Sequence, residues 1–289
     1  MEPTSRRITG SQGLDLHLLE WSQEGVPMVL VHGFGNEAHI WQDFAQEVAG
    51  YYRVLGLDQR GHGDSGWPLH GEYEYPHFMA DLDAVLENLS IERAVLVGHS
   101  LGGRVCMLYA GAHPEKVAGL VIVDSAPELD ARGTTRIQMD VGQHRDPSFG
   151  NVAEYEQMLL HNYPAAPPAV IRRMAEHSLK QREDGRWILK MDPALRGAVG
   201  TLETPEDRAE REKATTQSLW DALEKVTCPS LVVRGAASDI VSADVTDRMV
   251  EILGDQSQLA VVARAGHSVM TDNPAGFNEA VLSFVLGGS

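Results

Sequence analysis

The stretch AVLVGHSLGGRVCMLYAGA, residues 94–112, joins a short apolar run to a segment with helical periodicity. At the junction lies GHSLG, residues 98–102, which fits the pattern G-x-S-x-G. A serine on a sharp turn between a strand and a helix needs small neighbours, because the backbone is strained and crowded there. Gly98 and Gly102 meet this need, so the sequence predicts that Ser100 is a nucleophile on such a turn.

Apolar runs alternate with helical segments on both sides of this turn, which is the pattern of parallel βαβ units. The expected strands are 8–10, 14–21, 28–31, 53–57, 94–97, 117–123, 230–233 and 258–262, and the expected helices of this pattern are 39–48, 76–89, 101–112, 243–253 and 274–286. Between 127 and 220 we expect no clean strand, only helical pieces at 152–160 and 169–180. The sequence therefore predicts an α/β core of residues 1–126 and 221–289, interrupted by an inserted helical cap at 127–220.

Acyl transfer at Ser100 requires two N–H donors for the oxyanion of the tetrahedral intermediate. The backbone N–H of Leu101, at the start of the helix, is one candidate. The second is the N–H of Phe34, in the loop HGFG (32–35) that follows the strand 28–31.

A serine hydroxyl also requires an imidazole base and a carboxylate behind that base. His267 follows the last expected strand, and Asp239 follows the strand before it, which gives the chain order Ser, Asp, His. We therefore predict Ser100, Asp239 and His267 as the triad. Asp124, which ends the strand 117–123 at the same edge of the sheet, is the alternative acid. His99, next to the nucleophile, is expected to be structural.

The chain resembles the cap-bearing α/β-hydrolase superfamily in the stretches VHGFG (31–35), DQRGHGDS (58–65), GHSLGG (98–103), LVVRGAASD (231–239) and GHSVMTDNP (266–274). The resemblance implies an α/β-hydrolase fold with a mostly parallel, eight-stranded sheet flanked by helices, a Ser-Asp-His triad and no cofactor. The run 58–65 is expected to form a polar turn rather than to contact substrate.

Several reactions remain open within that superfamily. The first expectation is hydrolysis of a carboxylic ester, lactone or thioester of a small or medium acyl substrate. Hydrolysis of a carbon–carbon bond in a diketone-like substrate is an alternative, although such enzymes commonly resemble G-N-S at the elbow and have Trp after the histidine, where this chain has His99 and Ser268. A ligand receptor on the same fold is a third possibility.

A substrate pocket under the cap would need apolar walls, and Trp41, Tyr155 and Met158 are candidates for them. We find no Cys/His cluster with zinc spacing, so no metal is expected. The net charge of −17 disfavours binding to nucleic acid or anionic membranes. Without a signal peptide pattern at residues 1–10 or an apolar run of membrane length, we expect a cytoplasmic monomer or homodimer.

Overall fold

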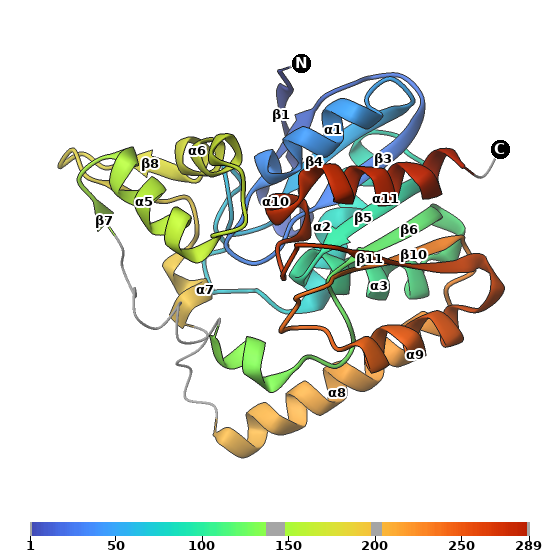
Figure 1. Ribbon diagram of the computed structural model, residues 1–289. Helices are drawn as coiled ribbons and strands as arrows, with labels where there is room; N and C mark the ends of the chain where they lie inside the picture. Colours follow the sequence, from blue (N-terminus) through green and yellow to red (C-terminus); the bar gives the residue numbers. More distant parts are fainter. Residues whose placement is uncertain (1, 137–147, 198–203, 288–289) are drawn as a thin grey trace.

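The computed structural model describes residues 2–136, 148–197 and 204–287, and its centre is an eight-stranded sheet in the order β1-β2-β4-β3-β5-β6-β10-β11 (Figure 1). The strands are β1 (Thr4–Thr9), β2 (Asp15–Glu20), β3 (Val26–Val31), β4 (Tyr52–Asp58), β5 (Ala94–His99), β6 (Val117–Val123), β10 (Ser230–Gly235) and β11 (Ser257–Val262). β2 is antiparallel to both of its neighbours, and the other pairs are parallel. The predicted fold class is confirmed.

Helices cover both faces of this sheet. α2 (Tyr75–Asn88), α3 (Leu101–Ala112), α8 (Pro205–Leu223) and α9 (Ala243–Leu253) pack on one face; α1 (Gln42–Val48), α10 (Val269–Asp272) and α11 (Pro274–Leu286) pack on the other. Short 3-10 turns lie at η1 (Ser11–Gly13), η2 (Ala38–Trp41), η3 (Pro114–Lys116) and η5 (Gly254–Gln256). Two layers of helices explain why the central strands are apolar on both faces.

β5 illustrates this two-sided burial. Leu96 packs in the cluster formed with α2, α3 and α8, whereas Val95 and Val97 pack in the cluster formed with α1 and α11. Because side chains alternate along a strand, burial on both faces leaves only the strand ends accessible. The carboxyl end of β5, where Ser100 follows, is therefore the place where this strand can present chemistry.

The inserted segment contains β7 (Ser148–Phe149), α5 (Val152–Asn162), α6 (Pro168–His177), β8 (Leu179–Gln181), β9 (Trp187–Leu189) and α7 (Pro193–Gly197). β7, β9 and β8 form a small antiparallel sheet, so the expectation of no strand in this segment was wrong. The expected helix at 169–180 also extended too far, because the chain leaves α6 after His177 and enters β8. These elements share a hydrophobic cluster of their own, separate from the clusters on the main sheet.

The predicted boundary between cap and core, at residues 220 and 221, falls inside α8. Leu219, Trp220 and Leu223 of this helix pack in the same cluster as α3. The carboxyl-terminal part of α8 therefore contributes to the core. Among the described residues, no helix combines the length and apolarity required to cross a membrane.

Candidate active site

Ser100 lies on a strained turn between β5 and α3. Its backbone has φ 51° and ψ −115°, outside the regions that residues with a side chain readily adopt. A Cβ atom on Gly102 would lie 2.2 Å from the carbonyl oxygen of Val31, and one on Gly98 would lie 2.5 Å from that of Gly102. Both glycines are thus required by close backbone packing, as the sequence predicted, and the turn holds Ser100 at the edge of the sheet.

His267 meets Ser100 from the loop that follows β11. Its Nε2 lies 3.0 Å from Ser100 Oγ, which places the hydroxyl in hydrogen-bond contact with a base. Two bonds hold this loop: Gly266 N–H donates to Asp272 at 2.8 Å, and His99 Nε2 lies 2.9 Å from the His267 carbonyl oxygen. Burial, with a further effect from His267, lowers the pKa of His99 to about 3. His99 is therefore neutral and positions the His267 loop.

The carboxylate behind His267 belongs to Asp124. Asp124 Oδ2 accepts from His267 Nδ1 at 2.8 Å and from the Ser238 hydroxyl at 2.6 Å, while Oδ1 accepts from Gly235 N–H at 3.0 Å. Asp124 is 1% exposed. Three donors hold the carboxylate in a fixed orientation, which is what a group that orients an imidazole requires.

The structure thus corrects the predicted position of the acid, because Asp239 does not contact His267. Its carboxylate pairs with Arg136 through two hydrogen bonds of 2.7 and 2.9 Å, and this pairing lowers its pKa. β6 lies directly beside β5 in the sheet, and Asp124 follows β6 immediately, whereas Asp239 lies four residues beyond β10. In that longer loop, Ser238 is the residue that turns toward the site.

The two expected oxyanion donors, Leu101 and Phe34, belong to two segments near Ser100, the start of α3 and the loop after β3. Leu101 is the first residue of α3, and the first N–H groups of a helix have no partner within it. A Cβ atom on Gly33 would lie 2.7 Å from His99 Nδ1 and 3.1 Å from the Cβ of Ser100, so the loop that carries Phe34 passes close to the nucleophile. The assignment of Leu101 and Phe34 as donors stays a prediction.

A cavity of ≈ 140 Å³ opens beside the nucleophile. It is lined by Tyr75, Ser100, Leu101, Arg104, Asp124, Ser125, Leu129 and Ile240. None of the three expected pocket residues lines it. Trp41 is fully buried and lies 6.1 Å, centroid to centroid, from Phe277 on the other face of the sheet, while Tyr155 and Met158 pack in the cap's own cluster. Apolar residue type alone could not separate core from pocket.

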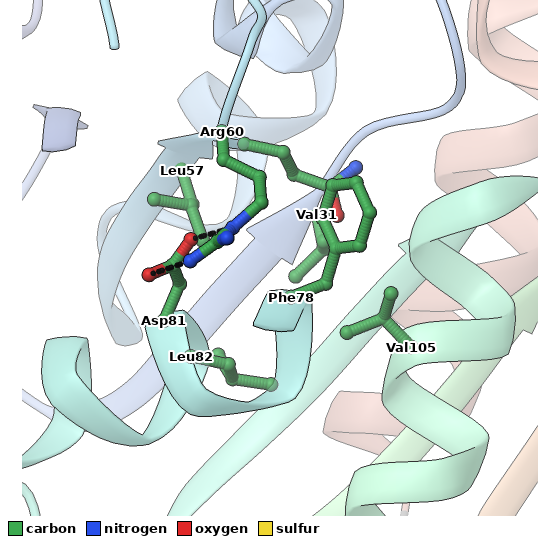
Figure 2. Close-up of a pocket in the computed structure, with 8 residues that line it drawn as sticks. Val31, Leu57, Arg60, Phe78, Asp81, Leu82 and Val105 are labelled. Atoms are coloured by element: carbon green, nitrogen blue, oxygen red, sulfur yellow. Dashed lines mark hydrogen bonds and ion pairs between the residues drawn. The ribbon is translucent and has the colours of Figure 1, made fainter. Parts of the chain in front are cut away.

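A second pocket, lined among others by Arg60, Phe78 and Asp81, has no room for a water molecule, with a volume of ≈ 0 Å³ (Figure 2). Arg60 is 0% exposed and binds Asp81 through two hydrogen bonds of 2.7 and 2.9 Å. This ion pair ties the loop after β4 to α2. The finding agrees with the expected structural role of the polar run 58–65.

A second Ser-His-Asp array lies at the edge of the main sheet, with an exposed serine. Ser5 Oγ is 2.8 Å from His17 Nε2, and His17 Nδ1 is 2.8 Å from Asp58 Oδ2. Asp64 lies close enough to His17 and Asp58 for the three to surround a cation, but Asp64 binds Lys190 at 2.9 Å. Ser5 lies within the regular edge strand β1 and not on a turn between a strand and a helix. The array therefore lacks the elbow that distinguishes Ser100.

Comparisons with known proteins agree with this architecture. The sequence model of a family described as alpha/beta hydrolase fold matches residues 26–274. An esterase of Mycobacterium tuberculosis is 28% identical over 273 residues, covering 91% of this chain and 84% of the esterase. A 3-hydroxybutyrate-oligomer hydrolase of Cupriavidus necator is 30% identical over 263 residues, covering 89% of this chain and 88% of that hydrolase. Among solved structures, E-2-(acetamidomethylene)succinate hydrolase has a TM-score of 0.85 at 26% identity, covering 98% of this chain and 99% of that one.

Proposed function

The chain belongs to the α/β-hydrolase fold family, and we propose that it is a serine hydrolase for a carboxylic ester, lactone or thioester of a small to medium substrate. The observation that carries the proposal is the hydrogen-bonded chain from Ser100 through His267 to Asp124 beside a cavity of ≈ 140 Å³. A hydroxyl, an imidazole and an oriented carboxylate in this order are the parts that acyl transfer uses.

The proposed reaction has two steps. Ser100 Oγ attacks the carbonyl carbon while its proton moves to His267 Nε2, and the backbone N–H groups of Leu101 and Phe34 stabilise the oxyanion. The tetrahedral intermediate collapses to an acyl-enzyme as the alcohol or thiol is released with that proton; the alcohol formed from a lactone stays attached to the acyl group. A water molecule, deprotonated by His267, then attacks the acyl group, and His267 returns that proton to Ser100 Oγ as the acid leaves. Asp124 stabilises the imidazolium in both steps.

The relatives support this substrate class. One is an esterase and another is a hydrolase of 3-hydroxybutyrate oligomers, each matching about nine-tenths of this chain. Other proteins similar to this chain are named epoxide hydrolase and chloroperoxidase, so similarity alone does not select the reaction. The proposal of ester hydrolysis therefore depends on Ser100 and its base, His267.

Labelling with a fluorophosphonate, followed by intact-mass spectrometry, tests the nucleophile directly. We expect one adduct on the wild type, mapped to Ser100, and none on Ser100→Ala. Turnover of p-nitrophenyl acetate and butyrate should fall by at least about 10³-fold in the same variant.

Ser5→Ala is the matched control, because Ser5, His17 and Asp58 form a Ser-His-Asp array with similar distances. We expect Ser5→Ala to keep both the adduct and the turnover. An adduct that follows Ser5, or a Ser100→Ala variant with wild-type turnover, contradicts the proposal.

A further inference from the structure

Arg104 is a cationic residue among those that line the cavity beside Ser100. Arg104 lies one helical turn after Ser100 on α3, its backbone N–H donates to the Ser100 carbonyl at 3.1 Å, and its side chain lines the cavity. The carboxylate in the lining, that of Asp124, has both oxygens occupied by donors. Arg104 is therefore the charge in this cavity that is open to a ligand.

The contacts of Arg104 orient its guanidinium without neutralising it. Nε donates to the Ala126 carbonyl at 3.0 Å, Nη2 to the Pro127 carbonyl at 3.1 Å, and Nη1 to the Tyr75 hydroxyl at 3.4 Å. Five N–H groups are present, so two have no partner among these contacts. Within the described part of the chain, no carboxylate forms an ion pair with Arg104. A half-buried cation held in this way is arranged to receive an anion.

We propose that Arg104 binds a carboxylate on the acyl part of the substrate, so that the preferred substrates are half-esters of small dicarboxylic acids or the corresponding thioesters. This inference rests on the proposed function. Because Arg104 lies one helical turn after Ser100, a carboxylate on Arg104 stays fixed relative to the acyl group in both steps. The cavity of ≈ 140 Å³ has room for an acyl part of a few carbon atoms.

Charge supports this assignment at the scale of the whole protein. The net charge of −17 repels anions in general, so an anionic substrate requires a local cation at the place where it binds. Arg104 supplies that cation next to the nucleophile. The remaining walls, among them Leu101, Leu129 and Ile240, suit the short methylene chain between ester and carboxylate.

The test compares monoethyl succinate with ethyl levulinate, which has a methyl ketone where the half-ester has its carboxylate. Ethanol release gives kcat/KM for both, and the ratio of the two values is the readout. We expect the wild type to favour monoethyl succinate at least about 10-fold, and Arg104→Gln to lower the ratio about 10- to 100-fold. Arg104→Lys should retain part of the preference. Arg93→Gln, the same charge change near the amino end of β5, should keep the wild-type ratio.

Binding to Ser100→Ala, measured by titration calorimetry, provides a readout independent of turnover. Monoethyl succinate should bind this variant and should bind the Ser100→Ala, Arg104→Gln double variant at least about 10-fold more weakly. A wild-type ratio near one, or an equal loss with both esters in Arg104→Gln, would overturn the proposal and leave Arg104 as a support for residues 126 and 127. If the serine-hydrolase proposal itself is wrong, Ser100 will carry no fluorophosphonate adduct, which distinguishes that outcome from a failure of the Arg104 proposal alone.

Discussion

At the residue scale, the identity of the acid is decided by the contacts of two aspartates. Asp124→Asn replaces the carboxylate that accepts from His267, so the imidazole loses both its tautomer preference and the charge that stabilises its protonated form. We expect kcat/KM for p-nitrophenyl butyrate to fall by about 10³- to 10⁴-fold. Asp239→Asn changes a half-exposed partner of Arg136 and should cost no more than a few-fold.

Steady-state kinetics on the two variants, with circular dichroism to verify folding, makes this comparison. A large loss of kcat/KM in Asp239→Asn together with a small loss in Asp124→Asn would show that Asp239 is the acid, as the sequence predicted. The sequence could not decide, because both aspartates follow strands that end at the same edge. The decision depends on backbone direction: Asp124 has a φ of 41°, and in the β10 loop it is Ser238 whose side chain turns inward.

At the element scale, the contact between α3 and β3 places the nucleophile. Gly102→Ala would put a Cβ atom 2.2 Å from the Val31 carbonyl oxygen, which neither backbone can avoid without moving α3 away from the sheet. We expect a loss of about 3 kcal/mol in the free energy of unfolding, measured by urea denaturation, and a loss of turnover. Gly119→Ala in β6 is the control, since its Cβ would have ordinary contacts from 3.7 Å outward.

A Gly102→Ala variant as stable as Gly119→Ala would contradict this packing.

Most helices and strands of the core could be predicted from the sequence, because buried strands and amphipathic helices leave clear periodic patterns. The sequence did not predict β7, β8 and β9, because strands of two or three residues are too short to show the alternation of apolar and polar side chains. The sequence did not predict the cavity either, because Arg104 occupies one position of a helical pattern, and only the fold shows that it lines a cavity together with Ser100.

At the scale of the whole molecule, buried histidines link stability to pH. His32, His62 and His99 are each 0 or 1% exposed, and burial is the main cause that lowers the pKa of each, to about 3 for His62 and His99. A histidine in the unfolded chain titrates near 6.5. Their contribution to stability is therefore complete above about pH 6.5 and declines as the pH falls toward 3, because the unfolded chain takes up protons that the folded chain does not.

His62 allows this linkage to be measured, because it lies in the polar turn after β4, where its Nδ1 contacts the Arg60 carbonyl oxygen at 3.0 Å. Between pH 7 and pH 5, it should account for about 2 kcal/mol of the decrease in the free energy of unfolding. We therefore expect urea denaturation of His62→Gln to show a pH dependence smaller by about that amount, whatever the substitution does to stability at pH 7. His161→Gln, on the exposed side of α5, serves as the control and should retain the wild-type dependence. Because the acidic chain also loses charge repulsion on acidification, only the difference between variants is diagnostic, and equal slopes in His62→Gln and His161→Gln would mean that His62 is protonated in the folded state.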